Sequence, residues 1–241
     1  MRDGSLTYQC KKLLLLLLAV SAFGWAGCSY PKPVRTYEYL DRYDRMTDRY
    51  DPRLSLVYLS PDRQITQYDN FIIGNVAVGE TSVNNPQKAN RYTTLFRTYF
   101  AHELNRLETF DELSLNSNAE FPSPTLRMEA MITRFKMGSG TARWFSFFFF
   151  FLQSSGATDM QIEGRIYDTH TGQVVMEFVD RRRHLGNTPF GPNPKTLNDH
   201  FVMKQTFLET ARYLASFIGK AHEGEPLEPT EEKSKKEGQS E

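Results

Sequence analysis

One stretch of the chain decides the fold, Ala157-Thr-Asp-Met-Gln-Ile-Glu-Gly-Arg-Ile-Tyr-Asp-Thr-His-Thr-Gly-Gln-Val-Val-Met-Glu-Phe-Val-Asp180. Its two halves, residues 157–167 and 173–180, have the length and the alternating residue types of strands. Between them, the Asp168 carboxylate can accept a local backbone N–H, and Gly172 tolerates a positive φ. The stretch therefore predicts an antiparallel hairpin.

The chain on either side of this hairpin predicts the other elements of a single domain. Asn85 and Pro86 are typical of a helix start, where the amide caps the first turn and proline takes the first helical position. Apolar residues at helical spacing then continue to Leu107, and a second such pattern runs over residues 198–221. Strands are expected at residues 54–59, 71–78, 113–115 and 125–135. The order strand, helix, strands, helix predicts an α/β fold of the α+β type, with a mostly antiparallel sheet and two packed helices over residues 54–221.

The amino terminus has the pattern of a signal peptide. Basic residues precede a leucine-rich run at residues 13–20, and small residues lead to Cys28. The segment Trp25-Ala-Gly-Cys28 resembles the lipobox of bacterial lipoproteins. That resemblance implies cleavage after residue 27, a diacylglyceryl group on the Cys28 thiol and an acyl chain such as palmitate on its amino group. It also implies a protein anchored in the cell envelope, and Ser29 favours the outer membrane, facing the periplasm.

Charge and cysteine content narrow the function classes. The 241 residues carry 29 basic and 29 acidic side chains, so there is no net basic charge of the kind that nucleic-acid binders show. Removal of residues 1–27 takes away three basic side chains and one acidic one, which changes the formal charge from 0 to −2. Cys10 leaves with the signal peptide and Cys28 carries lipid, so the mature chain would have no free thiol. No apolar run reaches the roughly 18 residues that a spanning helix needs.

Two polar segments flank the predicted domain. Residues 28–53 are rich in Tyr, Arg and Asp, and the tetrapeptide of residues 41–44 recurs at residues 48–51. We interpret this segment as a solvated tether behind the lipid anchor, with a partner-binding arm as the alternative. Residues 222–241 contain almost no apolar side chains and predict a disordered charged tail.

Two short motifs carry a family resemblance over residues 54–221. Gly138-Ser-Gly-Thr-Ala-Arg143 and Asp168-Thr-His-Thr-Gly172 are similar to segments shared by an uncharacterised family of bacterial envelope lipoproteins. The order of elements also resembles the α/β domains of the curli secretion-channel lipoprotein, penicillin-binding-protein activators and the amino-terminal domain of the Tol-Pal translocation protein. The resemblance implies a lipoprotein domain that works with other envelope proteins.

A phenylalanine run is the most unusual segment after the signal peptide. It comprises Phe147, Phe148, Phe149, Phe150 and Phe151. In a strand these side chains would point alternately to opposite faces, so one core cannot take them all. Either a partner, a lipid or another copy covers some of them, or the segment is buried on both faces.

A basic cluster, Arg181, Arg182 and Arg183, follows the hairpin and precedes His184. It is a candidate contact for lipid headgroups or anionic glycans, and the alternative is a solvated strand end. The glycines at 138 and 140 lack the strand-to-helix context of a phosphate loop, so they favour a bend in the sheet.

The histidine spacings match no metal-site pattern, and no catalytic motif is recognisable, so we predict no metal, no cofactor and no enzyme activity. Together these features predict a non-catalytic assembly or accessory component of a secretion, transport or envelope complex. Its expected partners are the membrane, through Cys28, and either another protein or further copies of itself. The alternative is a periplasmic glycan-binding protein or hydrolase that uses the Arg181–His184 region.

Overall fold

The computed structural model describes the chain from residue 31 onward, with gaps. The described residues are 31–48, 50–51, 53–62, 64–80, 83, 85–138, 158–184, 187–188, 191–192, 198–225 and 227. The elements are η1 (Tyr43–Arg45), β1 (Leu56–Leu59), η2 (Ile65–Gln67), β2 (Asn70–Val78), α2 (Pro86–Arg106), β3 (Glu112–Ser114), β4 (Thr125–Lys136), β5 (Thr158–Asp168), β6 (Val174–His184), β7 (Asn187–Thr188), β8 (Gly191–Pro192) and α4 (Asp199–His222).

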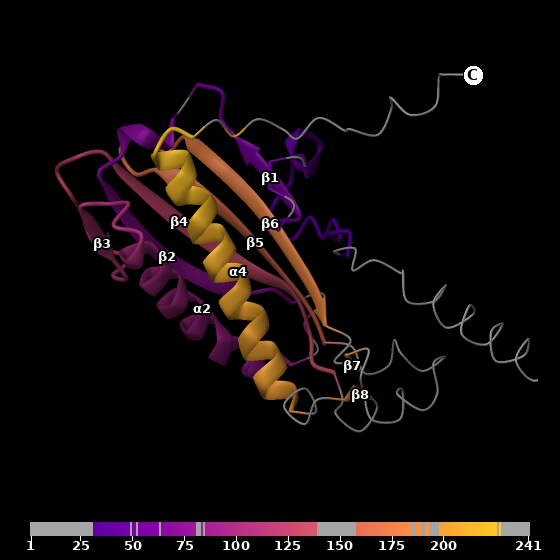
Figure 1. Ribbon diagram of the computed structural model, residues 1–241. Coiled ribbons are helices and arrows are strands. Elements are labelled where there is room, and N and C mark those ends of the chain that lie inside the picture. The colour runs from indigo at the N-terminus through magenta and orange to yellow at the C-terminus, as the bar shows by residue number, and fades with distance from the viewer. Residues whose placement is uncertain are drawn as a thin grey trace, which may run out of the picture. The chain divides into compact units, whose positions relative to one another are not determined.

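Six strands form one open sheet in the order β1-β6-β5-β4-β2-β3, as Figure 1 shows. The pairs β1–β6, β6–β5 and β5–β4 are antiparallel, whereas β4–β2 and β2–β3 are parallel. The parallel part arises because α2 carries the chain from the end of β2 back to the starting end of the sheet. The predicted α+β class with a mostly antiparallel sheet is confirmed. A small pair, β7–β8, forms a separate two-stranded sheet.

The two helices lie next to each other on one face of the sheet (Figure 1). α2 begins as predicted, since Asn85 Oδ1 accepts the Lys88 N–H at 2.9 Å and Pro86 opens the first turn. Asn198 caps α4 in the same way and accepts the N–H groups of His200 and Phe201. None of the described helices is long and apolar enough to cross a membrane.

The main core fills the space between the helices and the sheet. Alternate residues of β5, such as Met160 and Ile162, are buried there against aromatic side chains of α2 and α4, including Phe96 and Phe207. Burial of each such side chain stabilises the fold by about 1.5–3 kcal/mol. Gly164 is required in this row, because a Cβ there would lie 2.2 Å from the ring of Phe178 on β6.

The β5–β6 hairpin turns as its sequence predicts. Asp168 Oδ1 accepts the N–H groups of His170 at 2.8 Å and Thr171 at 3.1 Å. Gly172 has a φ of +69°, which a residue with a side chain rarely adopts. β6 continues beyond Asp180 to His184, where β5 pairs with it as far as Thr158. The basic cluster is therefore part of the strand.

Candidate functional site

Residues 31–46 pack on the outer face of the sheet, the face opposite the helices. Val34 exchanges two hydrogen bonds with the Gln161 side chain, at 2.8 and 2.6 Å. Leu40, Tyr43 and Met46 are buried and form a second apolar cluster with Val179 of β6. The interpretation of residues 28–53 as a solvated tether is therefore wrong for its described part. The sequence misled because its apolar residues are few and do not form a helical stripe.

Glu163 of β5 is the centre of this contact, since its buried carboxylate accepts four hydrogen bonds. Tyr43 donates to Oε2 at 2.7 Å. Donors to Oε1 are the Thr36, Thr133 and Gln161 side chains, at 2.9, 2.8 and 2.9 Å. Burial raises the pKa of Tyr43, the Thr36 hydrogen bond opposes that rise and Glu163 adds to it, so that together they bring the pKa to about 12. Tyr43 thus stays protonated and remains a donor at neutral pH.

Asp159, two residues before Gln161 on the same face, joins two arginines. Arg134 Nε lies 2.7 Å from Oδ2, and Arg181 contacts both carboxylate oxygens at 3.0 and 2.8 Å. Burial by itself would raise the pKa of Asp159, but the hydrogen bonds from Arg181 and Arg134 outweigh it and lower that pKa. Arg181 also donates to the Lys32 carbonyl at 2.6 Å, which ties the first described residues to β6.

Glu177 of β6 also joins two arginines, as Asp159 does, and it contacts the later part of the N-terminal segment. Its side chain is buried and forms ion pairs with Arg45 at 2.6 Å and Arg165 at 3.0 Å. The Arg45 guanidinium also lies 4.1 Å above the Tyr58 ring of β1. The carboxylates of the outer face thus hold the N-terminal segment in place and are enclosed by it.

A different ion pair lies on the helix side of β6. Asp180 is fully buried, with Oδ2 2.7 Å from Arg182 Nε and 2.6 Å from Thr210 Oγ1 of α4. Its Oδ1 has no hydrogen-bond partner among the residues that the structure describes. Burial raises the pKa of Asp180, although Arg182 and Thr210 oppose that effect. The pair joins β6 to α4.

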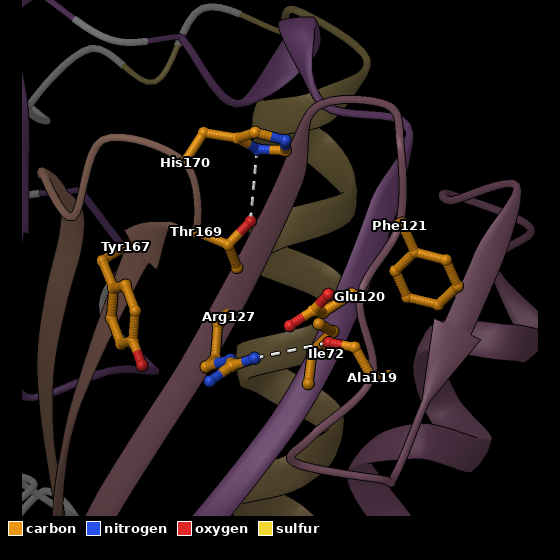
Figure 2. A pocket seen from close by; sticks show the side chains of 8 residues that line it. All are labelled: Ile72, Ala119, Glu120, Phe121, Arg127, Tyr167, Thr169 and His170. Atoms are coloured by element: carbon orange, nitrogen blue, oxygen red, sulfur yellow. Dashed lines mark hydrogen bonds between the residues drawn. The ribbon is translucent and has the colours of Figure 1, made fainter.

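A pocket of about 320 Å³ opens over the outer face near the β5–β6 turn (Figure 2). In Figure 2 the Arg127 guanidinium points between Tyr167 and Glu120. Arg127 donates to the Ala119 carbonyl at 3.4 Å, while its buried Nε has no hydrogen-bond partner in the described part of the chain. Burial, and next Glu129, raise the pKa of Tyr167, whose hydroxyl donates to Glu129 at 2.9 Å. The lining residues are Ile72, Ala119, Glu120, Phe121, Arg127, Tyr167, Thr169 and His170.

This pocket can bind a small polar or anionic group through Arg127. It was missed by sequence reasoning because its residues come from β2, β4, β5, the loop before β4 and the β5–β6 turn, with no fixed spacing. Among the residues that the structure describes, no group of His, Cys, Asp and Glu could hold a metal ion.

The predicted site residues fall in three situations. Cys28 and the run Phe147–Phe151 lie outside the described residues, as do residues 139–143 of the glycine motif. Arg181 and Arg182 are engaged by Asp159 and Asp180, and the Arg182 side chain is only 3% exposed. Arg182 therefore cannot make the predicted anion contact. Arg183 remains exposed on the outer face.

Comparison with known proteins gives remote structural neighbours. No protein-family model and no curated protein matches the sequence. A PelC dodecamer from Paraburkholderia phytofirmans is 10% identical, covers 68% of this chain and 96% of its own, and has a TM-score of 0.41. Protein XCC0632 of the DUF330 family, from Xanthomonas campestris, is 8% identical over 69% of this chain and 92% of its own, with a TM-score of 0.40. The hypothetical protein CT253 from Chlamydia trachomatis is 12% identical over 62% and 97%, with a TM-score of 0.35.

Proposed function

We propose that this chain is a lipid-anchored protein of the cell envelope and acts as a non-catalytic assembly or accessory component of a secretion, transport or envelope complex. The observation that carries the proposal is the position of the N-terminal segment. The predicted lipidation site, Cys28, precedes Pro31 by three residues, and packing on the sheet begins at Lys32 and Val34. A lipid at Cys28 would thus be joined to the folded domain by only a few residues and would hold that domain close to the membrane.

The outer face supports a structural role for its charged groups. The carboxylates of Glu163, Asp159 and Glu177 are each bound by donors from the sheet or the N-terminal segment. Such enclosed groups favour a rigid connection between the anchor and the sheet over chemistry on a substrate.

The open sheet supports assembly with another chain. β2 pairs with β3 only over Asn70–Ile72, so among the described residues Ile73–Val78 has no strand on the side away from β4. An unpaired strand edge is a template for a further strand. We propose this edge as a contact with a protein partner or a second copy.

The lipid anchor is tested by fatty-acid labelling in cells. We expect label in the natural chain and none in Cys28→Ala. Equal labelling of both chains would contradict the anchor. Fractionation of the labelled protein then checks the proposed outer-membrane location.

Assembly is tested by native mass measurement and pull-down of the mature protein, with and without lipid. We expect an oligomer or a stable partner, and weaker association in Asn75→Lys, because an edge lysine discourages strand pairing. Arg212→Lys, an exposed change on α4, is the control. A persistent monomer without partners would contradict the proposal.

The phenylalanine run is tested separately with Phe148→Ser/Phe150→Ser. If these residues form an interface, the variant stays folded and associates less. If they belong to a core, the variant loses folding. Circular dichroism together with native mass distinguishes the two.

The alternative is a periplasmic glycan-binding protein or hydrolase, and the observation that favours it is the Arg127 pocket. An arginine whose buried Nε has no partner among the described residues, beside Tyr167 and Thr169, suits an acidic sugar. Calorimetric titration with glucuronic acid tests this, with Arg127→Ala as the variant. Saturable binding that Arg127→Ala abolishes would favour this alternative over assembly.

A further inference from the structure

The outer face of the sheet is basic at one end, where β4 and β6 finish and β5 begins. Cross-strand pairing places Lys136, Asp159 and Arg183 in one row across these three strands. The next row contains Arg134, Gln161 and Arg181. Side chains that are directly opposite, or two residues apart on one strand, share a face of the sheet. We call these two rows, together with Lys32, the basic end.

The basic end contains more cationic side chains than carboxylates. Asp159 is the one carboxylate in the two rows, and Arg134 and Arg181 share it. Lys136 and Arg183 flank it and are exposed, as is Lys32. The two rows alone carry four cations and one carboxylate, a net charge of +3. This local excess contrasts with the formal charge of −2 that the mature chain would have.

The N-terminal segment meets the sheet at this same end. The Lys32 carbonyl accepts a hydrogen bond from Arg181, and the chain then passes Gln161 and Glu163 on its way along β5. Cys28 is three residues before Pro31, and three extended residues span at most about 11 Å. Lipid chains at Cys28 would therefore hold the basic end near the membrane surface.

We propose that the basic end docks on anionic lipid headgroups and so orients the domain on the membrane. This inference rests on the proposed lipid anchor for its geometry. The lipid supplies attachment, and the phosphates supply a counter-charge for Lys32, Lys136 and Arg183, which form no ion pair with another described residue. One lipid anchor leaves a domain free to rotate, whereas a second, electrostatic contact fixes which side meets the membrane.

Acidic residues limit the contact to one side of the sheet. Glu38 lies over Gly79 at the end of β2, and its carboxylate accepts the Glu80 N–H. These two carboxylates lie on the β2 side of β4, away from the β5–β6 pair. The membrane contact is therefore assigned to the β4–β5–β6 part of this end.

The test uses residues 29–241, which retain every described residue and lack the proposed lipid. The packed unit begins at Pro31, so this chain contains all of it. Sedimentation with phosphatidylcholine vesicles, with and without one third phosphatidylglycerol, measures the contact. We expect binding to the anionic vesicles only, and weaker binding as salt is raised. Lys136→Ala/Arg183→Ala should lower the partition coefficient by roughly twenty-five-fold, at about five-fold for each cation near an anionic surface.

The matched control is Arg42→Ala/Arg212→Ala, which removes two exposed arginines elsewhere and should leave binding unchanged. Equal binding to neutral vesicles, or an equal loss in the control, would overturn the proposal. Displacement of the protein from the vesicles by inorganic phosphate, at concentrations too low to screen charge, would also overturn the proposal. The ligand of the basic end would then be a free anion and not a lipid headgroup. Failure of Cys28 acylation leaves this test unaffected, so the two proposals fail separately.

Discussion

The two faces of the sheet are stabilised by different interactions, although the same strands supply both. The helix face is covered by α2 and α4 and filled with apolar side chains, with the Asp180–Arg182 pair at its β6 side. The outer face is covered by the N-terminal segment and contains Glu163, Asp159 and Glu177 in hydrogen bonds and ion pairs. Successive side chains of each strand point to opposite faces. One sheet can therefore pack apolar side chains against the helices on one face and bind the N-terminal segment through polar side chains on the other.

The largest effect is expected on the helix face. Asp180→Ala should cost about 3–5 kcal/mol of unfolding free energy, because the buried Arg182 would lose its 2.7 Å ion pair and keep the longer, 3.5 Å contact with Glu209 as a counter-charge. Urea unfolding measures it. The double variant Asp180→Leu/Arg182→Met should recover most of that loss, since a buried pair can be replaced by apolar groups of similar volume. A double variant less stable than Asp180→Ala would contradict this account.

A smaller effect is expected at Glu163 on the outer face. Tyr43→Phe and Thr133→Val each remove one of its four donors, and each should cost about 1–3 kcal/mol. The double variant should show non-additive losses, because both donors act on one carboxylate. If Tyr43→Phe had no effect on urea unfolding while Thr133→Val did, the N-terminal segment would not be held by this hydrogen bond.

The two faces should also respond oppositely to pH. The pKa of Asp159 is lowered from 3.8, so its contribution to stability is present above that pH and lost as pH falls through the folded value. The pKa of Asp180 is raised from 3.8, so its contribution is complete below that pH and lost as pH rises through the folded value. Asp159→Asn should reduce acid sensitivity, and Asp180→Asn should remove a loss at higher pH. Unfolding curves across pH 3–7 measure both, and equal slopes in the two variants would refute the assignment.

The smallest effect is expected at Arg183. Its side chain is exposed, so Arg183→Ala should change the unfolding free energy by less than about 0.5 kcal/mol. Arg181→Ala is the comparison within the same cluster, and it should cost more because Arg181 binds both Asp159 and the Lys32 carbonyl. Thermal unfolding of both variants tests this. Similar melting temperatures would show that the basic end is not fixed internally.

Local patterns in the sequence were sufficient for most elements of the domain. Asn85 caps α2 as predicted, α4 begins within a residue of the predicted start, and Asp168 with Gly172 forms the turn. These features depend on hydrogen bonds between a few neighbouring residues, so they form without contacts to the rest of the fold. The sequence does not predict that Arg181 and Arg182 are held by carboxylates. A run of arginines after a strand is typical of a solvated strand end, and the partners Asp159 and Asp180 are found only in the structure.

The sequence by itself determined the class of fold, the helix boundaries and the hairpin, because hydrophobic period, caps and turn residues act locally. Only the tertiary structure decided that residues 31–46 pack on the outer face, and that β2 lies parallel to β4. The first outcome depends on contacts between residues more than a hundred positions apart, such as Tyr43 with Glu163 and Arg45 with Glu177. The second depends on pairs between two separate strands, such as Asn70 with Thr125. No periodic pattern of residue types marks the carboxylate contacts in the sequence of either segment, because each carboxylate is brought to its partner only when the strands pair.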